Sequence, residues 1–226
     1  MSWVVIEETL RRHAMNLAVI AFLLAIAMFG FGAAMSNRPG TTWPGLVTLF
    51  AIVIGCGVIG PEFSSGTLQL ILVKPINRAV YLISRVAGVV LVVWSAALLG
   101  FICEVLGRAY SGVVPWKPLG IALFNAMIGP LLIVSLLALL GSVTRAYFNV
   151  AAYWALQMLL GALLAFRRKL PESVGAAGQF VQNNLFPDTP YGFSRDWLLL
   201  VLANAAIAIL LACLAFRRRE VPYGAD

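Results

Sequence analysis

The sequence alternates between long apolar runs and short polar segments, and this pattern predicts its elements. Most of the apolar runs are about 20 residues long, which suffices for a helix to cross roughly 30 Å of hydrocarbon. The chain therefore predicts six membrane-spanning helices within one all-α domain over residues 1–226. Their expected limits are Ala14–Met35, Leu46–Gly60, Ala79–Gly107, Leu119–Leu140, Ala146–Phe166 and Trp197–Phe216.

The polar segment before the first apolar run has a helical pattern of its own. Its apolar and charged side chains separate onto two sides, as Trp3, Ile6 and Leu10 against Glu7, Glu8, Arg11 and Arg12. This predicts an amphipathic helix over residues 1–13 that lies in the membrane interface. The alternative is a cytosolic extension of the first span.

Composition supports the membrane class independently of the pattern. Hydrophobic residues make up 62% of the 226 residues and charged residues only 11%. A soluble domain is about half apolar and about a quarter charged, so this chain has too few polar side chains to cover a soluble surface. We therefore expect an integral membrane protein.

The net charge of +7 comes from basic residues that flank the apolar runs. No basic patch is interleaved with aromatic residues, so the charge predicts no nucleic-acid partner. With a cytoplasmic N-terminus, the inner side holds Arg11, Arg12, Lys74, Arg78, Arg85, Arg145, Arg217, Arg218 and Arg219. The outer side then holds fewer basic residues, namely Arg38, Arg108, Lys117, Arg167, Arg168, Lys169 and Arg195. The positive-inside rule therefore favours a cytoplasmic N-terminus.

The residues that carry most enzyme chemistry are scarce. The three cysteines lie apart inside apolar runs, and His13 is the single histidine. No metal-binding cluster and no Ser/His/Asp or Cys/His arrangement can be assembled from this set. Glu7, Glu8 and Arg12 match the EExxxR motif of one intramembrane protease family, but that chemistry needs further histidines on later spans. We therefore expect neither an enzyme nor a cofactor site in this chain.

The longest polar segment, residues 167–196, separates the last two predicted spans. It contains three prolines, a GAAG step and an Asn-Asn pair. These residues favour turns, although Gln179, Phe180 and Val181 are compatible with a short helix. In the six-span topology this loop lies outside the cytoplasm.

A second polar segment, GPEFSSGTLQLILVKPINR, interrupts the apolar pattern between the second and third spans. Pro61 suits the first position of a helix, and Pro75 stops a helix. Residues 61–75 therefore predict a short helix that is too polar to cross the bilayer. At 100° per residue its polar and small residues share one face, namely Glu62, Ser65, Gly66 and Gln69.

The same segment resembles the signature of type-2 ABC exporter permeases. Those proteins commonly read E-x-x-x-G-T-L, a few leucines and then P-x-x-R. Here Glu62 is followed by Gly66-Thr67-Leu68 and then by Pro75 and Arg78. The interfacial helix, six spans and short basic C-terminus also fit that family, so the resemblance covers nearly the whole chain.

The resemblance implies a function. Residues 61–75 would form a cytosolic coupling helix that docks on a separate ABC ATPase subunit, and the chain would be the permease half of an ATP-driven exporter. No GxxxxGK phosphate loop occurs here, so ATP and Mg would bind to the partner. A second permease, identical or related, completes the membrane part. The coupling residues would be Glu62, Ser65, Gly66, Thr67, Gln69, Pro75 and Arg78. The alternative is a non-transporting membrane anchor or scaffold subunit.

Polar residues inside the predicted spans are the candidates for a substrate route. They are Asn125, Gln157 and Asn204, although such amides commonly hydrogen-bond between helices. Arg85 and Glu104 lie near the ends of the third span, and we expect both to snorkel towards water. These residues do not identify a substrate, although an apolar route favours a hydrophobic or amphipathic one.

Overall fold

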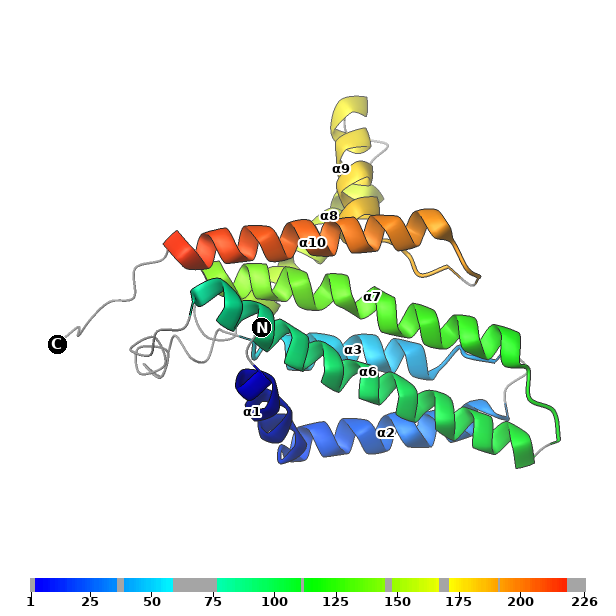
Figure 1. Cartoon of the computed structure of the whole chain (residues 1–226). Coiled ribbons are helices and arrows are strands. Elements are labelled where there is room, and N and C mark those ends of the chain that lie inside the picture. Colours follow the sequence, from blue (N-terminus) through cyan, green and yellow to red (C-terminus); the bar gives the residue numbers. More distant parts are fainter. Residues whose placement is uncertain are drawn as a thin grey trace.

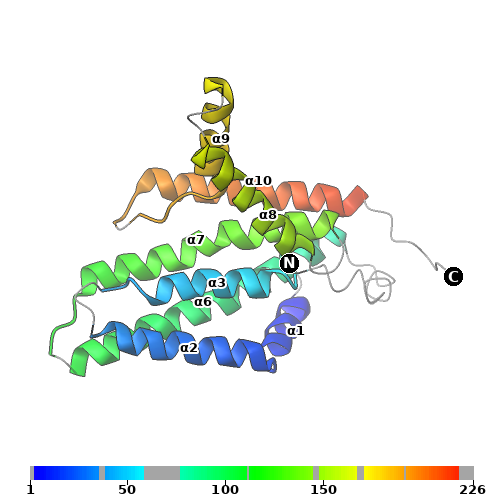
Figure 2. The ribbon, with the colours of Figure 1, turned by 180° about the vertical axis from the view of Figure 1, so that it is seen from behind.

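The computed structural model describes residues 3–35, 39–58, 77–110, 112–144, 148–166, 171–190 and 192–218, and all regular structure within these ranges is helical. The helices are α1 (Trp3–Ala14), α2 (Leu17–Ala33), α3 (Trp43–Gly55), α6 (Arg78–Tyr110), α7 (Trp116–Val143), α8 (Phe148–Ala165), α9 (Glu172–Leu185) and α10 (Arg195–Arg218). Five of them, α2, α3, α6, α7 and α10, run side by side as a bundle (Figures 1 and 2). The prediction of an all-helical chain is confirmed for the described residues.

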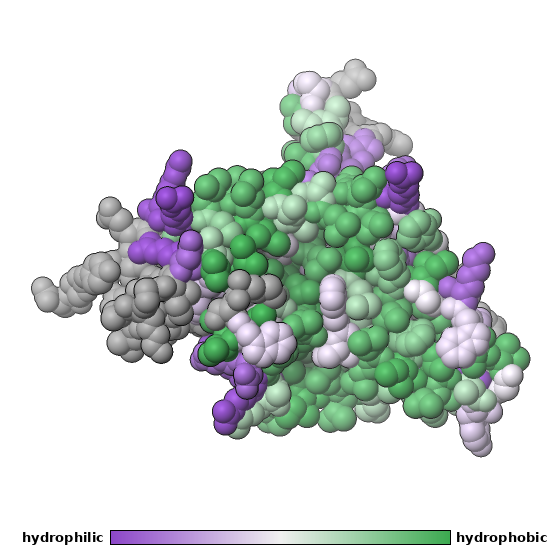
Figure 3. All heavy atoms as spheres, in the orientation of Figure 1, coloured by the Kyte–Doolittle hydropathy of each residue, from purple (hydrophilic) through white to green (hydrophobic). Residues whose placement is uncertain are grey.

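Four of the described helices are long and apolar enough to cross a membrane, namely α6, α7, α8 and α10. The pair α1 and α2 forms a fifth candidate if the two count as one bent span. α3 has only 13 residues, fewer than a span needs. On the face shown in Figure 3, apolar residues cover the middle of the bundle and hydrophilic ones gather towards its two ends. The chain is therefore built as a membrane protein, while a count of six crossings stays a prediction.

α1 and α2 are separate helices that meet at an angle of 75°. Asn16 caps α2, because its side-chain oxygen accepts a 3.0 Å hydrogen bond from the backbone N–H of Ala18. The first apolar helix thus begins at Leu17, three residues later than the sequence pattern predicted. α1 is not a straight extension of α2. Whether it lies in the membrane interface stays a prediction.

Two of the three residues on the predicted apolar side of α1, Ile6 and Leu10, pack against the rest of the protein, whereas Trp3 is 70% exposed. Val5 and Thr9 are buried as well, because α1 packs on α6. At this contact a Cβ on Gly88 would lie 2.8 Å from Cβ of Thr9, so the two helices approach closely.

Arg85 lies at the same contact and corrects an expectation. Its Nη1 donates a 2.8 Å hydrogen bond to Oγ1 of Thr9, and the residue is only 4% exposed. The side chain therefore lies between α1 and α6 instead of snorkelling. Sequence alone could not reveal this, because the acceptor belongs to a residue 76 positions earlier.

The segment between α8 and α10 is more helical than expected. α9 covers 14 residues, Glu172–Leu185, and includes the three that suggested a short helix. It packs mainly on α8 and stands away from the bundle in both views (Figures 1 and 2). The residues after α9, 186–190, return along the bundle and form part of the site described next.

Candidate functional site

The predicted coupling segment lies almost wholly outside the described residues. This holds for Glu62, Ser65, Gly66, Thr67, Gln69 and Pro75. Arg78 is described, and it is the first residue of α6. Asn77 caps that helix, since its Oδ1 accepts a 3.0 Å hydrogen bond from the N–H of Ala79. The coupling role of the segment stays a prediction.

A cavity of about 670 Å³ opens between α7, α8 and α10. Its remaining wall comes from residues 39–48, before and within the start of α3, and from residues 185–190, at the end of α9 and after it. Asn125 and Gln157 both line it. The fold thus brings together two of the three amides that the sequence singled out, although they lie 32 positions apart in the chain.

Asn125 is 5% exposed and is oriented by one hydrogen bond. Its Nδ2 donates to the carbonyl oxygen of Pro190 over 2.9 Å, which ties α7 to the segment after α9. Because the amide nitrogen must face that carbonyl, the amide oxygen faces elsewhere. Oδ1 is buried and has no hydrogen-bond partner.

Two further residues of the cavity wall carry buried polar atoms without a hydrogen-bond partner. They are Oε1 of Gln157 on α8 and Nε1 of Trp197 on α10. An unsatisfied buried group costs about 1–3 kcal/mol, and native proteins contain few. Three such atoms belong to residues that line this one cavity. A bound molecule that supplied their missing hydrogen bonds would therefore be favoured here.

A proline interrupts the hydrogen bonding of α7 at the same wall. Pro130 lies inside the helix and lines the cavity together with Ala126. Because proline has no N–H, it cannot donate the usual helical hydrogen bond to the carbonyl of Ala126, four residues earlier. The sequence pattern did not single out this feature, although the proline is visible in it.

Asn204 does not line this cavity. Its Nδ2 donates a 3.2 Å hydrogen bond to the carbonyl oxygen of Asn184, joining α10 to the end of α9. That geometry corresponds to a helix–helix hydrogen bond, the alternative that the sequence left open for such amides.

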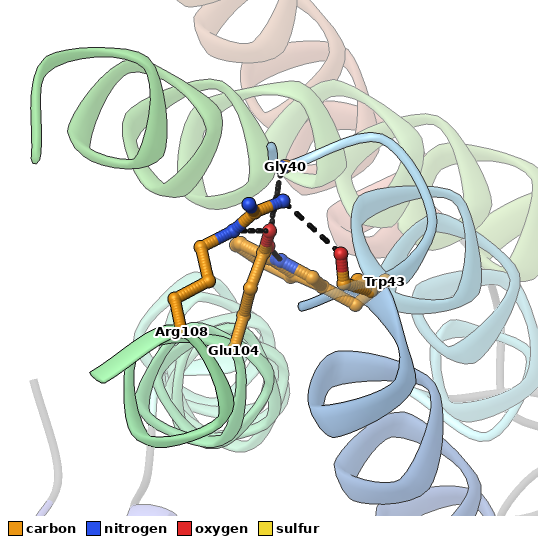
Figure 4. Close-up of polar contacts among 5 residues, drawn as sticks. Gly40, Trp43, Glu104 and Arg108 are labelled. Carbon is orange, nitrogen blue, oxygen red and sulfur yellow. Dashed lines mark hydrogen bonds and ion pairs between the residues drawn. The ribbon is translucent and has the colours of Figure 1, made fainter. Parts of the chain in front are cut away.

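The wall formed by residues 39–45 is held by a buried acidic side chain (Figure 4). Glu104 on α6 is 0% exposed. Its carboxylate oxygens both lie 3.1 Å from the N–H of Gly40, and Oε2 accepts a 2.7 Å bond from Nε1 of Trp43. Arg108 completes the group: its Nε donates to Oε1 over 2.8 Å, and its Nη2 donates to the carbonyl of Ala33 over 3.0 Å.

This cluster contradicts the expectation that Glu104 snorkels. The carboxylate is buried because it satisfies N–H donors from the α2–α3 connection, from α3 and from α6 at once. The i,i+4 spacing of Glu104 and Arg108 was the available signal in the sequence. Its distant partners, Gly40 and Trp43, were not predictable from spacing.

The cluster also fixes the backbone of the cavity wall. Gly40 has a φ of +68°, and a Cβ built there would collide with Cβ of Ala122 on α7. Glycine therefore permits both the left-handed conformation and the close approach. Glu104 holds this glycine from one side while α7 supports it from the other.

The described lining of the cavity carries charge of one sign only. Asp188, which is exposed, is the one charged residue in the described lining, and no lysine or arginine belongs to it. The potential at the mouth therefore favours cations over anions. No group of three or more His, Cys, Asp or Glu side chains suited to a metal ion occurs in the described ranges.

Comparison with known proteins gives one family. Residues 4–221 match the model of a family described as a protein of unknown function (DUF2705). A search of curated proteins finds no match. Because the family model covers nearly the whole sequence, the chain belongs to this DUF2705 family.

Proposed function

We propose that this chain is the membrane subunit of an ATP-driven exporter of the type-2 ABC class, which receives work from a separate ATPase. The observation that carries the proposal is the pattern from Glu62 through Gly66-Thr67-Leu68 to Pro75 and Arg78. It lies between two apolar helices, since α3 ends at Gly55 and α6 begins at Arg78. That is the position of a coupling helix in the resembled proteins.

Two features of the fold support the proposal. The amphipathic α1 packs on the first turns of α6, next to the coupling segment in sequence. The apolar helices supply the membrane part: α6, α7, α8 and α10 are long and apolar enough to cross, and the bent pair α1 and α2 gives a fifth candidate. The proposal takes the shorter α3 as the sixth crossing. In this arrangement the N-terminus is cytoplasmic, the membrane is the bacterial inner membrane, and a second permease subunit pairs with this one.

In the proposed mechanism, α6 transmits movement from the coupling segment to the cavity wall. This helix has 33 residues, a length of about 50 Å at 1.5 Å per residue. The coupling segment precedes one end of it, and Glu104 lies near the other. When the ATPase closes, its push on residues 62–67 moves α6 and the helices packed on it as rigid bodies. Through Glu104 that movement reaches Gly40 and the wall of the cavity.

The test measures coupling directly. Glu62→Ala should leave insertion and thermal stability unchanged but weaken co-purification of the ATPase and lower the ATPase rate of the assembled complex. Asp196→Ala is the matched control, because it removes an exposed carboxylate from the opposite end of the bundle. Unchanged co-purification and ATPase rate for Glu62→Ala would show that the coupling assignment is wrong.

The alternative, a non-transporting anchor subunit, makes a different prediction. An anchor would keep ATPase binding but give no ATP-dependent movement of a substrate in proteoliposomes. The cavity with its unpartnered polar atoms favours the transporter, because a plain anchor gains nothing from leaving buried groups unsatisfied.

A further inference from the structure

The cavity between α7, α8 and α10 has a composition that selects for a chemical class of ligand. We propose that it binds an organic monocation with an apolar body, of the ammonium type, whose N–H groups donate to the cavity wall. The proposal concerns binding by this chain alone. The identification of this ligand as the exported cargo rests on the proposed function.

Two of the three unpartnered buried polar atoms in the wall residues are acceptors that lack donors, namely the side-chain oxygens of Asn125 and Gln157. Pro130, which lines the same wall, has no N–H to donate to the carbonyl of Ala126. A protonated amine donates hydrogen bonds and accepts none, so it matches this set. The unpartnered N–H of Trp197 is the exception, and it would be satisfied by an ester or ether oxygen on the ligand.

The charge of the wall selects in the same direction. Asp188 supplies a negative charge, and the described lining holds no basic side chain to neutralise it or to attract an anion. An anionic ligand would meet a carboxylate and several acceptor oxygens together. Electrostatics therefore separates cations from anions of the same shape.

The apolar part of the wall accommodates the body of the ligand. Tyr153, Phe186 and Trp197 line the cavity, together with aliphatic side chains from α7. Aromatic rings bury apolar surface and attract cations through the ring face. The volume of about 670 Å³ lies within the usual range for sites of drug-sized molecules.

The experiment uses the purified full chain in lipid nanodiscs. Rhodamine 6G is the probe, because it combines a delocalised positive charge, N–H donors and an ester oxygen on an aromatic body. Fluorescein is the matched anion with the same ring system, and Nile red is an uncharged apolar control. Fluorescence polarisation, corrected with empty nanodiscs, should show saturable binding of rhodamine 6G and at least about tenfold weaker binding of fluorescein.

Three variants locate the binding. Asp188→Asn should weaken rhodamine 6G binding by about fivefold, the range expected for one exposed charge, and the loss should shrink at high salt. Gln157→Leu should weaken it by about tenfold, since a charged donor loses its acceptor. Asp196→Asn is the control, because it removes a carboxylate outside the cavity, and it should bind rhodamine 6G as the unmodified chain does.

The outcomes separate cleanly. If fluorescein or Nile red binds as tightly as rhodamine 6G, or if the Asp188 and Gln157 variants bind rhodamine 6G unchanged, the cavity is not a cation site. Absence of saturable binding of rhodamine 6G would also overturn the proposal. Binding without ATP-dependent uptake in proteoliposomes containing the ATPase would support the site and count against the proposed function alone.

Discussion

Nε1 of Trp43 donates a 2.7 Å hydrogen bond to Oε2 of Glu104, joining the first residue of α3 to the distal part of α6. Both side chains are fully buried. The same carboxylate accepts from the N–H of Gly40 and from Nε of Arg108. A buried charge is tolerated when its partners are complete, so these residues are expected to respond to substitution as a unit.

Removal of the acid should destabilise the fold strongly. Glu104→Gln leaves the Arg108 guanidinium buried without its counter-charge, a change that costs about 3–5 kcal/mol in comparable sites. The measurement is thermal unfolding of the purified chain in detergent. The double variant Glu104→Gln with Arg108→Met should recover much of the loss. If the double variant unfolds at no higher temperature than Glu104→Gln, the loss does not come from an uncompensated charge on Arg108.

Gly40, which lies next to this cluster, should also tolerate substitution poorly. Gly40→Ala imposes a left-handed conformation on a residue with a Cβ, at roughly 1–2 kcal/mol, and drives that Cβ into Ala122. Gly45→Ala is the matched control in the same segment, since its Cβ would meet no atom within 4 Å. The temperature of thermal unfolding should fall for Gly40→Ala only. Equal behaviour of the two would contradict the described course of this segment.

The contact between α1 and α6 can be broken at one glycine. Gly88→Ala places a methyl group 2.8 Å from Cβ of Thr9, so α1 must shift outward. Hydrogen exchange of the α1 amides should become faster, because the helix loses packing while the bundle stays intact. Gly120→Ala on α7 points into open space and should leave α1 exchange unchanged. Unaltered exchange in Gly88→Ala would show that α1 does not depend on this contact.

α1 should also respond to pH through His13. Burial lowers the pKa of this histidine, and the charges of Arg85 and Arg12 lower it further, against the raising effect of its hydrogen bond to the Thr9 carbonyl. The folded state therefore favours the neutral ring. This contribution to the stability of α1 is complete above the ordinary pKa of 6.5 and is lost as the pH falls through the lower folded pKa.

Hydrogen exchange of α1 at descending pH, corrected for the intrinsic exchange rate, measures this effect. Protection should decrease below about pH 6.5. His13→Gln removes the titrating group and should flatten the dependence. A dependence that persists in His13→Gln would assign the effect to other groups.

The helical class was predictable because its cause is local. Apolar runs of membrane-spanning length are visible along the chain, and so is the alternation in residues 3–14. The boundary at Asn16 depends on one capping bond, and the face of α1 that is buried depends on α6. Sequence periodicity describes a helix in isolation, so it did not indicate that Thr9 is buried against α6.

The candidate site was predictable in its residue types but not in its assembly. Asn125 and Gln157 attracted notice as amides within apolar helices, and they share a cavity wall. Asn204 has the same chemistry and makes a helix–helix bond instead. Asp188 and the segment around Gly40 come from connections, whose paths depend on tertiary contacts that hydropathy does not encode.

The buried pair on α6 has a consequence for the order of biosynthesis. Its partners, the Ala33 carbonyl, the Gly40 N–H and the Trp43 indole, all precede α6 in the chain. Synthesis from the N-terminus therefore makes the donors and the acceptor that receive this charged pair before Glu104 and Arg108 themselves.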